Sequence, residues 1–451
     1  MSNNICLATN YLQMTEVNRQ MWIDFDRYLD EFGCRLVLFS TAVPDDLPFA
    51  ILPHPYLIPE YAQRYPNAVY EKVTAVSPKE LDWLEADAAR ALRPYPISEG
   101  INGLNACRNV WSAILRTLQP GFVMVADNTL CQTSLVHEMC RESDIPSVIY
   151  ERGLLPETLM VESRGILGQS DMRTHWLAHG FSESACDDAA FEQIRGYYLA
   201  HRPQKYAQPG FGSGGAELRE KWGLGKKKVV VCFGHYDPVG CVPVNGKASH
   251  YNSPGFRSTP DLLMALQSCL GRDPNIEIVF KQHPIDPDPY TIAKLNGIRV
   301  VYDVNVHALI DLADVVVTQF TTLQFETVLY DKPVVLAGRS AWWGRNAAYE
   351  VKRPEDLHQS VYSALNRVDW PARRKNARAF ITTIMERWLI GCNDRVPTRR
   401  NLRDFAKFVA ETSLDANRLP AIENRWEQTE AVLESLRPAA PAPLTMSFSK
   451  L

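Results

Sequence analysis

The sequence predicts an α/β protein in which two Rossmann-like domains face each other across a cleft. Its 451 residues exceed what one hydrophobic core usually supports, so two domains are expected. Strand-like apolar runs alternate with helical patterns in both halves of the chain, which is typical of βαβ units and a parallel sheet. Between the halves, residues 202–215 read RPQKYAQPGFGSGG, and their glycine, proline and serine content predicts a connection between domains.

The first α/β domain is predicted over residues 1–205, followed by a linker over residues 206–225. In this domain the apolar and helical patterns predict three strands and one helix, at residues 35–39, 122–126, 147–150 and 131–142.

The second domain is predicted over residues 226–370. Its expected strands are residues 228–233, 276–280, 298–302, 314–318 and 333–337, and its expected helices are residues 260–270, 306–312, 323–330 and 354–367. Residues 371–416 are expected to form helices that pack back toward the first domain. Residues 417–451 predict a last helix and a tail that is disordered because of its proline and alanine content.

Composition excludes several classes of protein. The hydrophobic fraction of 46% and the charged fraction of 22% are those of an ordinary globular protein. A net charge of −4 argues against a general nucleic-acid binder. No apolar stretch approaches the roughly 20 residues that span a bilayer, and the N-terminus lacks the pattern of a signal peptide. The ten scattered cysteines indicate reduced core residues, so we expect a cytoplasmic protein.

Polar residues follow three predicted strands of the second domain. Lys281, Gln282 and His283 follow the strand at residues 276–280. Residues 319–322 follow the strand at residues 314–318, and Gly338-Arg339 follows the strand at residues 333–337. In an open parallel sheet, ligands bind at the carboxyl ends of the strands, where a following helix offers its N-terminus to a phosphate. The pattern therefore predicts a nucleotide site at this edge.

A dinucleotide-dependent dehydrogenase is disfavoured. No GxGxxG follows any predicted strand, and the first strand of the second domain leads into FGHYDPVG, which is not a glycine fingerprint. The two-domain architecture also occurs in GT-B glycosyltransferases and in the non-hydrolysing sugar-nucleotide epimerases.

Four segments resemble one bacterial family. They are residues 150–155 (YERGLL), 234–237 (GHYD), 281–284 (KQHP) and 318–344, which includes the Thr–Phe–Glu helix, a KPVVLAGR strand and WWG. Their types and order are similar to those of the capsule-polysaccharide-type Kdo transferases, GT-B-like enzymes that move 3-deoxy-D-manno-oct-2-ulosonic acid (Kdo) from CMP-Kdo onto a glycan. The chain departs from the family at Gln282, which replaces a proline, and at Pro238, which stands where an acidic residue is expected.

The resemblance implies a retaining mechanism with two carboxylates. Asp237 would attack the anomeric carbon and form a covalent glycosyl-enzyme, and Glu151 would deprotonate the acceptor hydroxyl. Each residue also has a structural interpretation. Asp237 could cap a turn before Pro238, and Glu151 could form an ion pair with a neighbouring arginine.

Donor binding is expected from residues at the same strand ends. His283 would donate to a phosphate oxygen and stabilise charge on the departing CMP, unless it only caps its strand. Thr321 and Thr322 would bind the same phosphate or cap the helix, and Glu326 would accept hydrogen bonds from the ribose or contact cytidine. The remaining expected donor-site residues are Lys281, Gln282, Arg152 and Asn128.

The sequence thus predicts a retaining transferase that adds β-Kdo from CMP-β-Kdo to a capsule or lipopolysaccharide glycan. The Kdo carboxylate would pair with Arg152, Arg339 or Arg345. We expect no metal, no cofactor and no nucleic-acid partner. A lipid-linked acceptor would bring the enzyme to the cytoplasmic face of the inner membrane. The alternatives are a GT-B transferase or epimerase that uses another nucleotide sugar, and a non-catalytic sugar-nucleotide-binding subunit.

Overall fold

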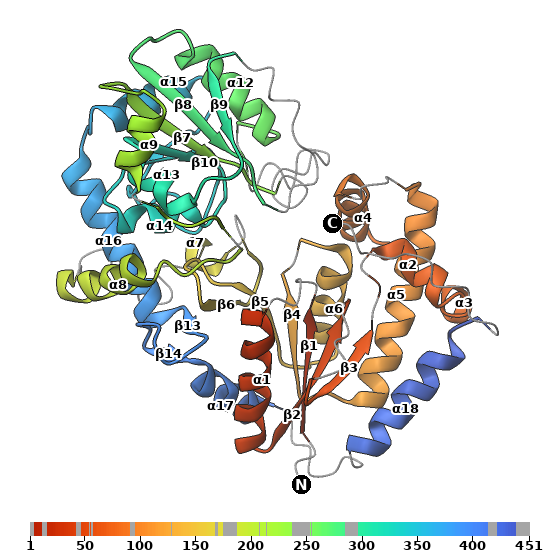
Figure 1. Ribbon diagram of the computed structural model, residues 1–451. Helices are drawn as coiled ribbons and strands as arrows, with labels where there is room; N and C mark the ends of the chain where they lie inside the picture. The colour runs from red at the N-terminus through yellow and green to blue at the C-terminus, as the bar shows by residue number, and fades with distance from the viewer. Residues whose placement is uncertain are drawn as a thin grey trace.

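The computed structural model contains two α/β lobes (Figure 1). It describes residues 4–10, 16–41, 47–53, 55, 57–90, 95–127, 129–166, 170–174, 187–206, 208–212, 214–236, 253, 255–284, 296–413 and 422–438.

The N-terminal lobe is built on an eight-stranded sheet in the order β14-β13-β6-β5-β4-β1-β2-β3. The five strands from β3 to β5 are parallel, in the chain order third, second, first, fourth and fifth, which is the order of a Rossmann sheet. Strand β6 runs antiparallel to β5, and β13 runs antiparallel to β6. The strands are β1 (Asn4–Asn10), β2 (Cys34–Ser40), β3 (Ala50–Pro53), β4 (Phe122–Ala126), β5 (Ser147–Arg152), β6 (Thr158–Glu162), β13 (Ile390–Gly391) and β14 (Arg400–Asn401).

Helices cover this sheet, and the longest shows why its sequence forms one. In α5 (Ile97–Leu118) the fully buried Leu104, Trp111 and Leu118 recur at helical spacing and face the core. Gly103 lets α2 pass closely, because a Cβ there would lie 2.3 Å from the carbonyl oxygen of Ile58. The other helices of this half are α1 (Glu16–Glu31), α2 (Ile58–Arg64), α3 (Ala68–Glu71), α4 (Pro78–Arg90), α6 (Cys131–Glu142), α7 (Asp171–Thr174) and α8 (Asp188–His201).

The C-terminal lobe has a six-stranded, wholly parallel sheet in the order β12-β11-β10-β7-β8-β9. Counted along this half of the chain, the order is again that of a Rossmann sheet, now with a sixth strand. The consecutive residues 229–232 of β7 are fully buried, as expected where helices cover both faces. The strands are β7 (Lys228–Phe233), β8 (Ile276–Lys281), β9 (Ile298–Val301), β10 (Val315–Thr318), β11 (Val334–Leu336) and β12 (Tyr349–Glu350).

The helices of this lobe are α9 (Gly215–Lys221), α12 (Thr259–Leu270), α13 (Val306–Leu312), α14 (Leu323–Leu329) and α15 (Asp356–Leu365). Helix α9 lies inside the segment that was expected to be a linker, and it packs against α13. Two hydrogen bonds fix this segment to the lobe. Asn305 Nδ2 donates to the carbonyl of Pro209 at 2.7 Å, and the Gly215 amide donates to Asp311 Oδ2 at 2.8 Å.

After α15 the chain returns to the first lobe (Figure 1). Helix α16 (Trp370–Arg387) packs against α8 and α14, α17 (Leu402–Thr412) against α1, and α18 (Ile422–Ser435) against α5. One buried apolar cluster includes Leu155 of the first lobe, Phe325 and Trp342 of the second, and Phe380 of α16. The two lobes therefore share a hydrophobic core.

The predicted fold class is confirmed, since both halves carry a Rossmann-ordered sheet. Among the described residues, no helix combines the length and apolarity of a membrane span.

Candidate functional site

The strand order of the C-terminal sheet locates its ligand edge. The order reverses between β7 and β10, and in such sheets ligands bind in the crevice at the carboxyl ends of the strands on either side. The chain leaves β7 through Gly234, whose amide donates to the Lys281 carbonyl at 2.8 Å. A Cβ on Gly234 would come within 3.1 Å of the His283 amide nitrogen, so a larger residue would push this turn away from β8.

His283 lies at this edge, directly beyond β8, between two aromatic rings. Its ring centroid is 5.3 Å from that of Tyr206 and 6.3 Å from that of Tyr236. Burial, reinforced by the positive charges of Arg152 and Lys205, lowers the pKa of His283 to about 4. The imidazole is therefore neutral at physiological pH and carries one N–H that can donate to an anion.

The two residues before His283 differ in their surroundings. Lys281 is buried, and its Nζ donates to the Tyr302 carbonyl at 2.6 Å, which ties the ends of β8 and β9 together. Burial lowers the pKa of Lys281, against the attraction of Asp303. Gln282 is half-buried. Lys281 therefore has a structural contact of its own, whereas its expected role in donor binding stays a prediction.

The start of α14 provides polar groups without the cap that the sequence allowed. Thr322 is the N-cap residue, but its side chain makes no capping hydrogen bond. Its Oγ1 instead accepts from Lys205 Nζ at 3.1 Å. Thr321 is buried, and its carbonyl accepts from Gln324 Nε2. Glu326 is 4% exposed and lies 3.7 Å from His307 Nε2.

Glu151 and Arg152 end β5, on the first lobe's side. Arg152 donates through Nη2 to the Tyr206 hydroxyl at 2.5 Å, and its guanidinium lies over the Tyr206 ring, 4.7 Å from the centroid. Arg152 Nε is 3.8 Å from Glu151 Oε1, so the ion pair offered as the alternative for Glu151 is present. Both side chains keep about a quarter of their surface, 24% for Glu151 and 23% for Arg152, and remain accessible.

Lys205, which was not among the expected site residues, joins the end of β5 to the start of α14. Its Nζ donates to the Gly153 carbonyl after β5 and to Thr322 Oγ1 at the start of α14. Burial of the amine, together with the charge of Arg152, lowers the pKa of Lys205, while Glu326 and Glu151 act in the other direction. Burial raises the pKa of Glu326, against the attraction of Lys205.

We call Glu151, Arg152, Lys205, His283, Thr322 and Glu326 the interlobe cluster. It combines residues from β5, the segment after α8, the end of β8, and α14. Its charged groups are only partly paired, and burial has a stronger influence on Lys205 and Glu326 than their mutual attraction does. Perturbed groups of this kind, at the carboxyl ends of Rossmann strands, mark a candidate binding or catalytic site.

Lys205 and Tyr206 were missed because their segment looked like a connection. Glycine and proline around them indicated a loop, and nothing in the local pattern predicts that this loop docks between the strand ends. The available signal was a charged residue next to an aromatic one directly after a helix, which is too common to be decisive.

Other expected residues lie elsewhere. Asn128 and Asp237 are outside the described residues. Arg345 Nη2 donates to the carbonyls of Met172 and Arg173, at 3.2 and 3.4 Å, and so fixes α7. Of the three arginines proposed for the Kdo carboxylate, Arg152 is the one in the interlobe cluster.

In the described part of the chain, no group of three or more His, Cys, Asp or Glu side chains could hold a metal ion.

Comparison with known proteins gives distant structural likenesses. No family model matches the chain, and no curated protein does. The chain is similar to a Thermosulfurimonas dismutans KpsC beta-Kdo 2,7-transferase, with 16% identity, a TM-score of 0.36, and coverage of 69% of this chain and 85% of that one.

Two further likenesses cover more of the chain. The S. aureus MnaA structure with UDP is 12% identical, with a TM-score of 0.40 and coverage of 84% and 94%. The trehalose 6-phosphate synthase of Burkholderia multivorans is 13% identical, with a TM-score of 0.43 and coverage of 97% and 99%. All three TM-scores lie below 0.5, so these likenesses assign neither a family nor an activity.

Proposed function

We propose that this protein is a retaining glycosyltransferase that moves β-Kdo from CMP-β-Kdo to a bacterial surface polysaccharide. The observation that carries the proposal is the interlobe cluster. Residues that the sequence resemblance associates with donor and acceptor come from different lobes and meet around Lys205. Their charges suit a donor with one phosphate and one carboxylate.

The phosphate of CMP would bind at the start of α14. The neutral His283 carries an N–H that can donate to the phosphate. Lys205 supplies a cation, and its Nζ is hydrogen-bonded to Thr322 Oγ1. Such donors stabilise the charge that grows on CMP as it departs. Glu326 would then have two roles, balancing Lys205 in the free enzyme and accepting from the ribose in the complex.

The Kdo carboxylate would bind Arg152. Its guanidinium is oriented by the Tyr206 ring and hydroxyl, and a guanidinium binds a carboxylate with two parallel hydrogen bonds. The other two candidate arginines do not belong to the interlobe cluster.

The chemistry would proceed by double displacement. An oxygen of Asp237 forms a bond to C2 of Kdo while the C2–O bond to CMP breaks, and CMP leaves with the electron pair. The acceptor oxygen then attacks C2, Glu151 takes its proton, and Asp237 leaves with the electrons of the ester bond. Two inversions give retention. The role of Asp237 rests on the sequence pattern, whereas Glu151 is accessible at the end of β5.

Nucleotide binding tests the proposal. CMP should raise the melting temperature more than UMP, UDP or GDP. A ligand at about 100 times its Kd stabilises the folded protein by roughly 2.7 kcal/mol. Incubation with CMP-Kdo should then add the mass of one Kdo residue to a peptide that contains Asp237. A larger shift with UDP would indicate another nucleotide sugar, and CMP binding without an adduct or turnover would favour a non-catalytic subunit. No shift with any nucleotide would overturn the proposal.

A further inference from the structure

A cavity of about 520 Å³ lies away from the interlobe cluster, where the loop after α14 meets the start of α16. Its volume is within the range of small-molecule sites, roughly 300–1,000 Å³. The residues that give it its character are Tyr330, Asp331, Lys332, Arg367, Trp370 and Arg374. Helix α14 connects the two regions, because Thr322 begins it in the interlobe cluster and Tyr330 ends it at the cavity.

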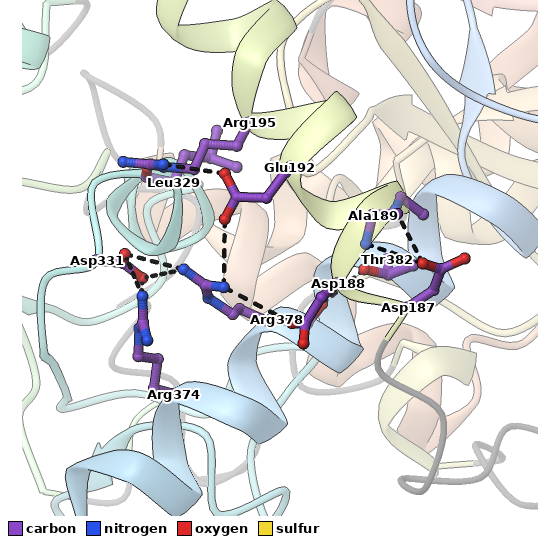
Figure 2. A network of polar contacts seen from close by, with 11 residues as sticks. Asp187, Asp188, Ala189, Glu192, Arg195, Leu329, Asp331, Arg374, Arg378 and Thr382 are labelled. Carbon is purple, nitrogen blue, oxygen red and sulfur yellow. Dashed lines mark hydrogen bonds and ion pairs between the residues drawn. The ribbon is translucent and has the colours of Figure 1, made fainter.

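The single carboxylate of the cavity is already paired. Arg374 donates to Asp331 through Nε at 2.8 Å and Nη2 at 2.7 Å, and Arg378 Nη2 lies 3.0 Å from both carboxylate oxygens (Figure 2). Although burial pushes the pKa of Asp331 upward, these hydrogen bonds hold it below its ordinary value. Asp331 is therefore ionised and occupied, and the cavity keeps a positive charge.

Acidic residues of α8 hold the second arginine. Arg378 Nη1 lies 3.3 Å from Glu192 and 3.7 Å from Asp188, so the arginine is fixed between α8 and the loop after α14 (Figure 2). We call Asp188, Glu192, Asp331, Arg374 and Arg378 the clamp. Because the clamp fixes Arg374 and Asp331, one wall of the cavity is preorganised.

The other cations have donors to spare. Lys332 Nζ uses one of its three donors, on the Asp311 carbonyl at 2.8 Å. Within the described part of the chain, Arg367 makes no side-chain hydrogen bond or ion pair, and its guanidinium lies 5.6 Å from the Trp370 ring centroid. Burial lowers the pKa of Lys332 against the attraction of Asp311 and Asp314, and Arg367 and Arg219 lower it further by repulsion. An anion between Lys332 and Arg367 would relieve the repulsion between these two side chains.

The backbone around the cavity is held in an uncommon conformation. Asp331, Arg367 and Asp369 have φ angles of 53°, 54° and 54°, in the left-handed region that side chains other than glycine rarely adopt. Such residues tend to occur where a site needs a fixed loop shape. Here they set the loops that carry Lys332, Arg367 and Trp370.

We propose that this cavity is a second binding site, for a sugar that carries a phosphate or a carboxylate. The anionic group would bind between Lys332, Arg367 and Nη1 of Arg374, for which the described residues provide no hydrogen-bond partner, and charge-assisted hydrogen bonds are available there. The sugar ring would lie against Trp370, whose indole supplies an apolar wall with one polar edge. This site is independent of the proposed transferase reaction.

Calorimetric titration of the full chain at low salt tests this. Glucose 6-phosphate or glucuronate should bind, inorganic phosphate should bind at least about tenfold more weakly, and glucose should not bind. The double variant Arg367→Gln, Lys332→Gln should lose about tenfold or more in affinity for the sugar anion, in line with loss of charged hydrogen bonds. Lys375→Gln removes an exposed charge from α16, the helix that carries Trp370 and Arg374, at a position outside the cavity. This variant should bind the sugar anion as the wild type does.

Two further measurements test the contact of the sugar with Trp370 and the independence of this site from the nucleotide site. Trp370→Ala should reduce the preference for glucose 6-phosphate over inorganic phosphate, and the strength of glucuronate binding tells whether carboxylate or phosphate is preferred. Saturating CMP should leave sugar-anion binding unchanged. Competition by CMP, an equal loss in Lys375→Gln, or no binding by the wild type would each overturn the second site. None of these outcomes depends on whether CMP-Kdo is the donor.

Discussion

The interlobe cluster and the clamp both contain carboxylates beside cationic side chains, but the balance between burial and pairing differs between them. In the clamp, two arginines hold Asp331, and their hydrogen bonds outweigh burial, so its pKa stays low. In the interlobe cluster, burial outweighs pairing, so the pKa of Glu326 rises and that of Lys205 falls. Both lie along α14 and the loop that follows it.

The difference separates a structural ion-pair network from a site that can respond to a ligand. Carboxylates whose partners satisfy them hold elements together and stay ionised. A group whose pKa is shifted by burial gains the most interaction free energy when a charged ligand binds beside it. Such groups therefore concentrate at functional sites.

The largest effect is expected at His283. His283→Ala should lower kcat of Kdo transfer by roughly 10²- to 10³-fold, because one stabiliser of the departing phosphate is lost. Activity measured with CMP-Kdo, together with circular dichroism, checks this. His201→Ala, on the exposed end of α8, is the control and should behave as the wild type does. Normal turnover in His283→Ala would exclude this residue from phosphate stabilisation.

In the clamp, we expect a loss of stability without a specific loss of chemistry. Arg378→Met should lower the free energy of unfolding by about 2 kcal/mol, because Asp331, Glu192 and Asp188 each lose one of their partners. Urea denaturation measures it. Arg403→Met breaks an ion pair in which Arg403 is 58% and Glu31 40% exposed, and it should cost less than about 1 kcal/mol. Equal losses in the two variants would mean that the clamp contributes no more than a surface pair.

The pH dependence of stability should differ between the clamp and His307, which lies 3.7 Å from Glu326 of the interlobe cluster. Burial, the charge of Arg202 and, in the other direction, the nearby Pro203 backbone set the pKa of His307 at about 4, below the ordinary value of 6.5. The unfolded chain then binds more protons between these values, so stability rises with pH in this window and is lost on acidification. Asp331, whose pKa is depressed, loses its contribution only below its ordinary value of 3.8.

A single variant isolates the histidine. Between pH 7 and pH 4.5 the wild type should lose roughly 2 kcal/mol more than His307→Asn, which has no proton to take up. Glu326 changes stability with the opposite sign, since its raised pKa favours the folded state at lower pH, and it is present in both proteins. Parallel curves for the two proteins would contradict the assignment.

The smallest effect is expected at Arg374. Its side chain is 41% exposed, and Arg378 still holds Asp331 when it is replaced. Arg374→Gln should therefore cost roughly 0.5 kcal/mol in urea denaturation. A loss as large as that of Arg378→Met would show that the exposed arm of the clamp, not the buried one, carries its stability.

Much of the fold followed from local pattern. The valine-rich apolar runs and the helical spacing of apolar residues predicted β4, β7, α6 and α13 with their observed bounds. The short strands β13 and β14 were not predicted, because two-residue segments have no periodicity and form only where β6 offers an edge. Arg400 gave no local sign of joining a sheet built mostly from the first half of the chain.

The site was only partly predictable, for a related reason. His283 and Thr322 follow strands, and strand ends in a parallel sheet meet at one edge, so periodicity was enough to propose them, whereas Glu151 was proposed from the family resemblance. Lys205 reaches that edge from a loop, and its position depends on how the loop folds back against both lobes. The clamp likewise depends on α8 and α16 meeting, which no local pattern encodes.

The core that joins the lobes has a consequence for how the chain can be handled. Phe325 and Trp342, at 1% exposure each, are covered by α16, which lies beyond the predicted end of the second domain at residue 370. A fragment that stops there would carry an uncovered aromatic surface and tend to aggregate. The whole chain should therefore unfold in one cooperative transition, and neither half should fold stably without the other.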